Sequence, residues 1–279
     1  MAKELSPTDR LKHTLAQWQS WQARLTRRPD LVGDLNGKSN DTFLVAGGNE
    51  QFVVRINSPA HRLGVDRTAE LQILTDIAAR EYAPSVVFAS EEILVTRYVT
   101  GGHPQPDQCR SWLDRAGRLF RTIHTTPTRV TTILDPLQHA INYCKAIENP
   151  DRLITACLEK LLQRPQVTPD DVCLCHNDLL FENIISNTAG WVAIDWEYAS
   201  LGDPAFDLAV LVETIDADDS ELEILLDAYG SQHPRDRINY YRDLYRLIEI
   251  MWWRLKSPDE PSLPGLTELA TRLDVTAPV

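Results

Sequence analysis

Hydrophobic residues in the first part of this chain repeat first with a helical period and then with the period of a strand. Apolar side chains recur at roughly helical intervals from Leu11 to Leu25, which predicts a leading helix within residues 1–30. Residues 41–56, DTFLVAGGNEQFVVRI, then place two apolar runs on either side of a Gly-Gly-Asn turn. That arrangement is typical of a β-hairpin.

A helix and two more strands are predicted after the hairpin. Residues 66–81 carry an apolar stripe that includes Ile73 and Ile77, the pattern of an amphipathic helix. Residues 85–99, SVVFASEEILVTRYV, contain two short apolar runs that predict two strands. A cluster of glycine and proline then interrupts the pattern, so we expect residues 31–100 to form a strand-rich N-terminal lobe.

Helical periodicity dominates residues 101–279, which we expect to form a second, larger lobe. The longest predicted helix covers residues 235–256. Within this region, residues 172–176 (VCLCH) predict a buried strand, and residues 183–195 predict a second hairpin around the turn NTAG. The whole pattern predicts an α+β fold with a small strand-rich lobe and a mainly helical lobe. A cleft between two lobes is a common place for a ligand site.

Composition narrows the classes of partner. The 279 residues are 43% hydrophobic and carry a net charge of −12 with a pI near 5.0. This balance disfavours a general nucleic-acid or anionic-membrane surface, because such surfaces are normally basic. The five cysteines form no Cys-x-x-Cys pair, so we expect reduced, mostly buried thiols in a cytoplasmic protein. The N-terminus lacks an apolar signal core, and no apolar run approaches the length of a membrane span.

Polar residues interrupt the strand pattern of residues 173–198, CLCHNDLLFENIISNTAGWVAIDWEY. Polar groups cost free energy when they are buried without partners, so a functional reason is expected. Asn183 and Asp195 flank the predicted hairpin, and we expect them to be neighbours because the outer ends of hairpin strands meet. An amide oxygen beside a carboxylate oxygen suits Mg²⁺ better than zinc. Asp178 lies on the loop that enters the hairpin, where it is placed to face a substrate hydroxyl.

Phosphoryl transfer needs a carboxylate at the attacking hydroxyl, metal ligands on the transferring phosphates and a cation on the nucleotide phosphates. Arg55 ends the strand FVVRI, and Glu70 follows on the next helix, where it is placed to hold the guanidinium toward phosphates. The polar turn of residues 35–43, LNGKSNDTF, is placed to cover those phosphates. Its candidate nucleotide-binding residues are Lys38, Ser39 and Asn40.

The segments HNDLLFEN, AIDWEY and GDPAFDLA follow one another between residues 176 and 209. Together with GKSNDTFLV and FVVRI upstream, this ordered set resembles the aminoglycoside phosphotransferase and choline kinase superfamily. The resemblance implies a protein-kinase-like bilobal fold and phosphorylation of a small-molecule hydroxyl that depends on ATP and Mg²⁺. Arg55, at a position where many aminoglycoside phosphotransferases have lysine, is similar to the choline- and thiamine-kinase-like members. The nucleotide loop departs from the Gly-x-Gly-x-x-Gly of protein kinases because it has only Gly37.

The resemblance also implies a role for each matching residue. Asp178 falls at the position of the catalytic base, and Asn183 and Asp195 fall at the magnesium ligands. Arg55, with Glu70 as its partner, falls at the cation that holds the phosphates. The hinge residues expected to bind adenine through their backbone are Arg97, Tyr98 and Val99. The residues expected to support the catalytic loop are His176 and Asp207, with capping of the helix at Phe206 as the alternative for Asp207.

The remaining residues favour a cationic substrate. Glu197 and Tyr198 follow the metal-site aspartate, and the last long helix carries Glu249 and Trp253. Aromatic faces and carboxylates hold quaternary ammonium or thiazolium groups by cation–π and charge attraction, so choline, ethanolamine and thiamine are the expected acceptor types. An aminoglycoside or amino sugar is the alternative, for which the acidic run of residues 216–223 would supply carboxylates.

Two other classes of protein stay open at this point. A metal-dependent hydrolase would use His176, Asp178 and Asp195 as ligands, but no further His or Asp ligand lies at close spacing. A nucleotide-binding module without catalytic activity would not need competent residues at all three chemical positions, Asp178, Asn183 and Asp195.

Overall fold

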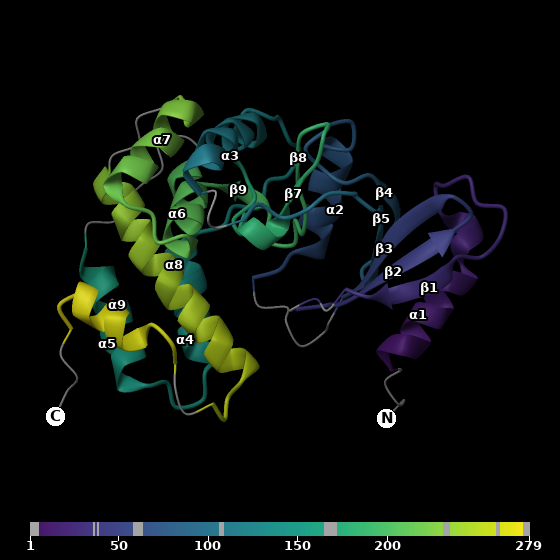
Figure 1. The fold of residues 1–279 in the computed structure, drawn as a ribbon. Helices are drawn as coiled ribbons and strands as arrows, with labels where there is room; N and C mark the ends of the chain where they lie inside the picture. Colours follow the sequence, from purple (N-terminus) through teal and green to yellow (C-terminus); the bar gives the residue numbers. More distant parts are fainter. Residues whose placement is uncertain are drawn as a thin grey trace. The chain divides into compact units, whose positions relative to one another are not determined.

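The computed structural model describes residues 6–35, 37, 39–57, 64–105, 109–164, 172–230, 235–260 and 263–275, without the side chains of residues 109–111. The chain divides into two units, and Figure 1 labels their helices and strands. The first unit is formed by Met1–His103 and Ile184–Glu197, and the second by Pro104–Asn183 and Tyr198–Val279. Ile184–Glu197 therefore belongs to the first unit, whereas the sequence suggested that the two lobes are contiguous stretches of chain.

The first unit is built on a five-stranded antiparallel sheet with the strand order β1-β2-β3-β5-β4. Its strands are β1 (Asp30–Asp34), β2 (Asp41–Gly47), β3 (Glu50–Ile56), β4 (Val86–Ala89) and β5 (Ile93–Arg97). The predicted hairpin is confirmed as β2 and β3, and the two further predicted strands are confirmed as β4 and β5. Gly48 in the hairpin turn has a φ of 66°, a conformation that glycine adopts without strain.

The leading helix α1 (Pro7–Ala16) packs on one face of this sheet. Ser6 caps it, and after its last turn the chain forms the short 3₁₀ helix η1 (Trp18–Ser20), so the helix is shorter than its apolar spacing suggested. Alternate residues of β3, beginning with Phe52, share a core with Leu11 of α1. The intervening residues of β3 therefore point to the opposite face of the sheet.

Helix α2 (Arg67–Asp76) and a second hairpin complete the first unit. Asp66 caps α2 by accepting hydrogen bonds from two backbone N–H groups of its first turn. The hairpin strands are β7 (Ile184–Ser186) and β8 (Trp191–Ala193), which pair antiparallel as predicted. A backbone bridge between Gly102 and Ser186 connects this hairpin to the segment that follows β5.

The second unit is mainly helical, and the predicted α+β fold is confirmed. Its helices are α3 (Cys109–His124), α4 (Pro136–Ala146), α5 (Arg152–Gln163), α6 (Pro204–Thr214), α7 (Asp219–Tyr229), α8 (Arg235–Lys256) and α9 (Leu266–Arg272). Strand β6 (Cys173–Cys175) pairs antiparallel with β9 (Ser200–Gly202), and the 3₁₀ turn η4 (Phe181–Asn183) ends the loop after β6. The bounds of α8 are those of the longest predicted helix.

Helices α6 and α8 form the centre of the second unit (Figure 1). Residues of α6 are buried on every side from Pro204 to Val212, as expected for a helix enclosed by other elements. Helix α8 packs on α4, α5, α6 and α9. Helices α3 and α7 approach closely at Gly117, where an added Cβ would lie 2.5 Å from the carbonyl oxygen of Leu225.

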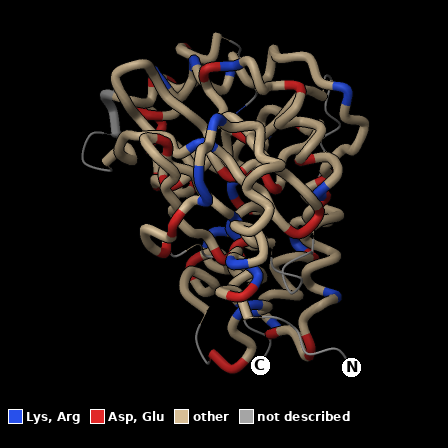
Figure 2. The backbone as a smooth tube through the Cα atoms, turned by 90° about the vertical axis from the view of Figure 1, so that its right-hand side faces the viewer, with Lys and Arg blue, Asp and Glu red and all other residues tan. Residues whose placement is uncertain are grey.

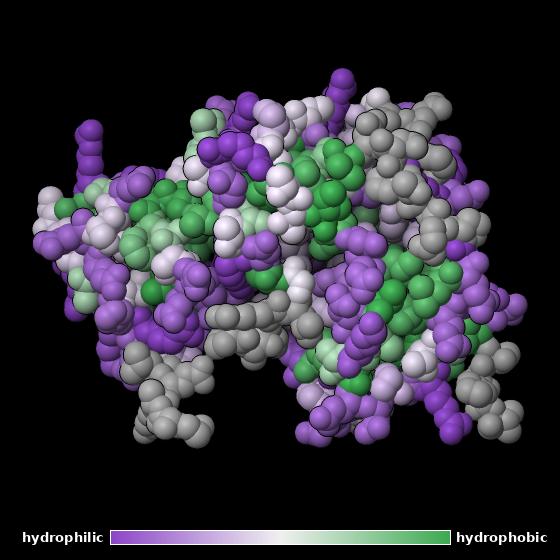
Figure 3. Space-filling model, turned by 180° about the vertical axis from the view of Figure 1, so that it is seen from behind, coloured by the Kyte–Doolittle hydropathy of each residue, from purple (hydrophilic) through white to green (hydrophobic). Residues whose placement is uncertain are grey.

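The surface is mixed in charge and hydropathy. Figure 2 shows Asp and Glu interspersed with Lys and Arg along the chain, so the net negative charge comes from many positions. On the face drawn in Figure 3, hydrophobic side chains gather in areas that are bordered by hydrophilic ones. Within the ranges that the structure describes, every helix is too short or too polar to cross a bilayer.

Candidate active site

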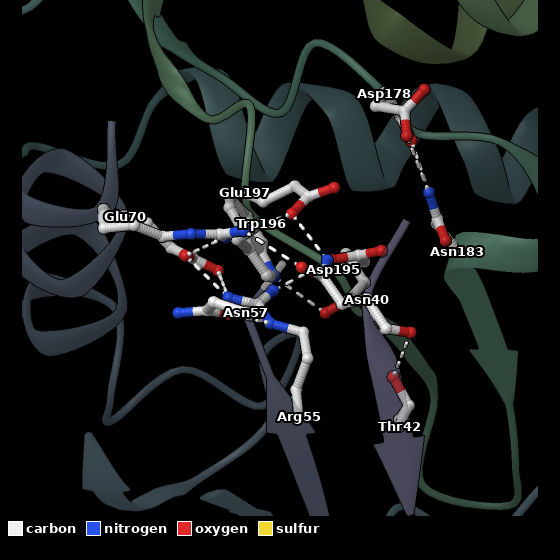
Figure 4. Close-up of polar contacts among 12 residues, drawn as sticks. Asn40, Thr42, Arg55, Asn57, Glu70, Asp178, Asn183, Asp195, Trp196 and Glu197 are labelled. Atoms are coloured by element: carbon white, nitrogen blue, oxygen red, sulfur yellow. Dashed lines mark hydrogen bonds and ion pairs between the residues drawn. The ribbon is translucent and has the colours of Figure 1, made fainter. Parts of the chain in front are cut away.

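Arg55 lies at the centre of an ion-pair network in the first unit (Figure 4). Because Phe52 and alternate residues of β3 face α1, the Arg55 side chain points to the other face of the sheet, where Glu70 of α2 meets it. Nη2 donates to both Glu70 oxygens at 2.7 Å, Nη1 donates to Asp195 Oδ1 at 3.0 Å, and Nε donates to Asn57 Oδ1 at 3.0 Å. The structure thus brings Arg55 and Glu70 together as a pair with side chains only 8% and 4% exposed.

A second arginine, Arg67, extends this network to Glu197. Its Nη1 donates to Glu70 Oε2 at 2.8 Å, and its Nη2 donates to Glu197 Oε2 at 2.9 Å. Asn40 Nδ2 donates to the same Glu197 oxygen at 2.8 Å. Glu197, predicted as a substrate contact, is therefore engaged inside the first unit and is only 4% exposed. The network contains the guanidinium groups of Arg55 and Arg67 and the carboxylates of Glu70, Asp195 and Glu197. When all five groups are ionised, the network has a net charge of −1.

These carboxylates keep Arg55 charged. Burial lowers the pKa of Arg55, but Glu70, Asp195 and Glu197 outweigh burial and raise the pKa above its ordinary value. The guanidinium is therefore a permanent cation that three negative groups hold in place. A fixed cation of this kind is suited to nucleotide phosphates.

Asp195 has an unusual backbone conformation and a perturbed carboxyl group. Its φ is 61°, in the left-handed region that non-glycine residues rarely adopt. The next residue, Trp196, is 1% exposed and donates from Nε1 to the Ala193 carbonyl oxygen at 2.8 Å, which anchors the turn after β8. Burial and then Glu197 raise the pKa of Asp195, Arg55 opposes both, and the resulting pKa is about 6. The Asp195 side chain is still 37% exposed. Because the protein disfavours its negative form, a bound cation would stabilise Asp195 as the carboxylate.

The polar turn before β2 is compact. An added Cβ on Gly37 would lie 2.3 Å from the Asn40 carbonyl oxygen, so this turn requires glycine for close backbone approach. Asn40 is 7% exposed, and its Oδ1 accepts a hydrogen bond from Arg67 Nη2 at 3.2 Å. Ser39 is half-buried in the same turn. Lys38 lies outside the described residues.

The segment predicted to contact adenine begins at the end of β5. The Tyr98 N–H donates to the Gln51 carbonyl oxygen at 2.9 Å, and Tyr98 and Val99 are half-buried. Arg97 forms an ion pair with Glu50, and its guanidinium carbon lies 5.8 Å from the centroid of the Phe52 ring. These contacts attach the start of the segment to β3.

Asp207 of α6 anchors the loop after β6 in the second unit. The His176 N–H donates to Asp207 Oδ2 at 2.8 Å, and the Asn177 N–H donates to Oδ1 at 2.6 Å. His176 is fully buried, and Asn177 adopts a φ of 64°. The alternative interpretation of Asp207 as a helix cap is wrong, because α6 begins at Pro204 and Asp203 caps it. Asp207 instead holds the backbone that leads to Asp178.

Asp178 is half-buried in this loop and is held by Asn183. Asn183 Nδ2 donates to the Asp178 carbonyl oxygen at 2.8 Å and to its Oδ2 at 3.2 Å. Figure 4 shows the amide nitrogen of Asn183 directed at Asp178, with the amide oxygen pointing away from it. The amide oxygen is therefore oriented for another partner. Amide and carboxylate oxygens are hard donors, so the chemistry of Asn183 and of Asp195 fits Mg²⁺.

Helix α8 brings Tyr245 into the electrostatic surroundings of Asp178. Burial raises the pKa of Tyr245 well above its ordinary value, and Asp178, Glu249 and Glu182 raise it further. Glu249 lies one turn after Tyr245 on the same helix face and accepts a hydrogen bond from Arg246 Nη1 at 2.8 Å. The second unit therefore places three carboxylates in the surroundings of Tyr245, one of them Asp178.

Trp253 forms an aromatic pair with Trp252 near the end of α8. The ring centroids lie 4.9 Å apart at an interplanar angle of 82°, and Trp253 is 42% exposed. Lys256 Nζ lies 4.7 Å from the Trp252 ring and 5.4 Å from the Trp253 ring. The indole pair already binds an ammonium group of its own chain. Tyr198 is half-buried, with its ring 6.3 Å from the ring of His139.

The acidic run of residues 216–223 has a local structural role. Asp218 caps α7 in a capping box with Glu221, and Arg235 pairs with Asp219 and Glu223. These partners account for most of the charge in the run. An assignment to a polycationic substrate therefore has no structural support from this segment.

Residues of these networks to which the sequence assigned no role in the site include Arg67, Tyr245 and His124. Arg67 precedes Glu70 by three residues on a predicted helix, a spacing that signals an ion pair. Tyr245 precedes Glu249 by four residues, which places both on one helix face. His124 hydrogen-bonds Asp207 across 83 residues of sequence, and no local pattern signals that contact.

Several known proteins are similar to this chain in sequence or in fold. Protein LicA of Haemophilus influenzae is 23% identical over 247 residues, which cover 80% of this chain and 72% of LicA. Probable choline kinase 3 of Arabidopsis thaliana is 23% identical over 217 residues, which cover 67% of this chain and 63% of that protein. The crystal structure of choline kinase LicA from Streptococcus pneumoniae has a TM-score of 0.77 at 20% identity, with 96% of this chain and 97% of that chain covered. At this level of identity the structural likeness shows the fold.

The family model described as the phosphotransferase enzyme family (APH) matches residues 30–241. This region covers most of the chain and includes the Arg55 network, the Asp178 loop and Asp207. Members of this family are small-molecule kinases. The chain therefore belongs to the phosphotransferase enzyme family.

Proposed function

We propose that this protein transfers the γ-phosphoryl group of ATP, with Mg²⁺, to the hydroxyl group of a small cationic molecule of the choline, ethanolamine or thiamine type. The observation that carries the substrate class is the electrostatic environment of Tyr245. Beyond the effect of burial, Asp178, Glu249 and Glu182 raise the pKa of Tyr245, and this group of carboxylates supports a cationic acceptor. A positively charged acceptor is the natural ligand of such surroundings.

Nucleotide binding is assigned to the first unit. Arg55 is a fixed cation on the sheet face away from α1, and Glu70 and Asn57 hold its orientation. The turn that contains Ser39 and Asn40 is tied to the same network through Asn40. Among related structures, LicA was solved with AMP, and a spectinomycin phosphotransferase was solved with ADP and spectinomycin. These complexes support ATP as the phosphoryl donor here.

Asn183 and Asp195 are the proposed magnesium ligands. The Asn183 amide oxygen points away from Asp178, and Asp195 belongs to a network with one uncompensated negative charge. When bound, Mg²⁺ would neutralise charge on the transferring phosphates. Ionised Asp195 is disfavoured in the metal-free protein, so the carboxylate gains from a cation.

Asp178 is the proposed general base. Its carboxylate accepts a hydrogen bond from Asn183 Nδ2, which orients it, and Asp207 holds the backbone of the same loop. Asp178 would accept the proton of the substrate hydroxyl as the oxygen attacks the phosphoryl group. His176 has a supporting role because it is fully buried and its N–H is bound to Asp207.

The proposed acceptor side includes Tyr198, Glu249 and Trp253. Residues 245, 249 and 253 recur every four positions on one face of α8, so this face extends about 12 Å from Tyr245 to Trp253. Trp252 and Trp253 hold the Lys256 ammonium, so their faces are able to bind a cationic group. A cationic acceptor that uses these rings displaces Lys256.

Other functions have less support. A hydrolase with a metal on His176, Asp178 and Asp195 is disfavoured because no further His or Asp ligand lies at close spacing in the sequence. A module without catalysis would not need Asp178 to be held by Asn183. An aminoglycoside or amino sugar remains the alternative acceptor, although the acidic run that would have received it is engaged in capping and ion pairs.

A phosphotransfer screen tests the proposal. The full-length protein is incubated with Mg-ATP and, separately, choline, ethanolamine, thiamine, an aminoglycoside and an amino sugar, and ADP release is measured. We expect acceptor-dependent ADP release with at least one of the first three, and no such release by Asp178→Asn. Turnover only with the aminoglycoside or amino sugar would replace the acceptor class. ATP binding without turnover on any acceptor, including a wider panel of small alcohols, would contradict the catalytic assignment.

A further inference from the structure

Two cysteines and a histidine form a cluster in the second unit that no step of the proposed reaction uses. Cys173 and Cys175 lie two residues apart on β6, so their side chains share one face of the strand. His124 is the last residue of α3. One ligand atom from each of these three residues lies within 4.8 Å of the others.

The sulfur positions fit a tetrahedral metal ion. Cys173 Sγ and Cys175 Sγ lie 3.8 Å apart, and both cysteines are free thiols. A tetrahedral zinc ion with Zn–S bonds of about 2.3 Å places two sulfur ligands about 3.8 Å apart. The thiols therefore need little movement to bind one ion.

The hydrogen bonds of His124 leave Nδ1 as its ligand atom. Nε2 lies 3.0 Å from Asp207 Oδ2, and an ionised carboxylate only accepts, so Nε2 carries the hydrogen and donates it. In the neutral ring, Nδ1 then has a lone pair, which accepts from the Tyr229 hydroxyl at 2.9 Å. A carboxylate that accepts from the second ring nitrogen is the common outer partner of metal-binding histidines. One hydrogen bond, that of Tyr229, must move for Nδ1 to bind a metal ion.

Charge selects the ion. Cys175 is fully buried, so the net charge of a complex at this position matters. A divalent ion that binds two thiolates and a neutral imidazole releases two protons and forms a complex with no net charge. A neutral complex is favoured at a buried position over the anionic complex that a monovalent ion would form.

We propose that Cys173 Sγ, Cys175 Sγ and His124 Nδ1 bind a zinc ion, with the Tyr229 oxygen or a water molecule as the fourth ligand. The ion joins β6 to the end of α3, and the loop that carries Asp178 follows directly after β6. The His124 Nε2–H bond to Asp207 is kept, and Asp207 holds the N–H groups of His176 and Asn177. Zinc therefore stabilises the anchor of the catalytic loop and takes no part in phosphoryl transfer.

Cobalt substitution provides the test. The full-length protein is stripped with a chelator, kept reduced with a phosphine and titrated with Co²⁺. We expect one Co²⁺ per chain with a thiolate-to-cobalt charge-transfer band and intense tetrahedral d–d bands, which one equivalent of Zn²⁺ removes. Weak octahedral bands with no charge-transfer band would overturn the proposal.

Variants locate the ion. Cys173→Ser and Cys175→Ser each remove a zinc ligand. Loss of a residue that only hydrogen-bonds a ligand weakens metal affinity roughly 10- to 100-fold, so each of these variants should lose more than that. Cys144→Ser is the matched control, because Cys144 is a free, half-buried thiol on α4 outside the cluster. Zn²⁺ should raise the thermal midpoint of the wild type and of Cys144→Ser but not of Cys173→Ser. Equal zinc affinity in all variants would place the ion elsewhere. If Cys175→Ser does not fold, the test rests on Cys173→Ser, whose site is half-buried, and on the cobalt titration of the wild type.

Discussion

Replacement of Glu70 with alanine perturbs the ion-pair network of the first unit most directly. Glu70 accepts from Arg55 and from Arg67, and the three side chains are 4%, 8% and 16% exposed, respectively. Removal of one partner of a buried ion pair typically costs about 3–5 kcal/mol, because the remaining charge is left desolvated and unpaired. Asp195 still faces Arg55 at 3.0 Å, and Glu197 still faces Arg67 at 2.9 Å. We therefore expect a loss at the lower end, about 3 kcal/mol in the free energy of unfolding.

Urea unfolding followed by tryptophan fluorescence measures this loss, with Glu50→Ala as the matched control. Glu50 pairs with Arg97 on the same sheet, but those side chains are 31% and 40% exposed. Partly exposed pairs contribute about 0–1 kcal/mol. Glu70→Gln, which keeps one hydrogen-bond acceptor without the charge, should lie between the two. Equal losses for Glu70→Ala and Glu50→Ala would refute the reasoning that burial determines the cost of breaking the pair.

The remaining predictions concern catalysis and binding. Asp178→Asn should abolish phosphoryl transfer with nucleotide binding largely intact, because the amide cannot accept a proton; unchanged turnover would exclude Asp178 as the base. Asp195→Asn should lose Mg²⁺-dependent nucleotide binding in calorimetry, and full retention would contradict the ligand role. The fold raises the pKa of Asp195 from 3.8 to about 6. As pH rises through this range, Asp195 ionises more readily in the unfolded chain than in the folded one, so the nucleotide-free wild type loses stability. Asp195→Asn should therefore have the higher thermal midpoint at about pH 8, by a margin that shrinks toward about pH 4; a margin that does not change with pH would contradict the sign. Trp253→Ala should raise KM for a cationic acceptor more than KM for ATP, and Lys256→Met should lower the acceptor KM because no internal ammonium competes for the rings. Equal effects of Trp253→Ala on both KM values would point to a packing role.

Local periodicity was sufficient to predict most of the elements. The β2–β3 hairpin follows from alternating apolar residues around a turn with Gly48, and α8 follows from a long apolar stripe. The end of α1 was not predictable in the same way. Its apolar spacing continues past Ala16, but the chain turns into η1 there, and Trp21 packs against Phe52 of the sheet. Packing on a distant strand outweighs helix periodicity at that point.

The sequence by itself determined which chemical groups this protein has and the order in which they occur. The sequence placed Arg55 at the end of a strand, and the spaced motifs around Asp178 and Asp195 indicated phosphoryl transfer. Only the tertiary structure decided which of these groups meet. Arg55 reaches Asp195 across 140 residues of sequence, and Asn40 reaches Glu197 across 157. Such contacts depend on how helices and sheets pack, which residue spacing does not encode, whereas secondary structure depends on neighbours a few positions away. The grouping of Ile184–Glu197 with the first unit and the meeting of His124 with the β6 cysteines follow from the same packing.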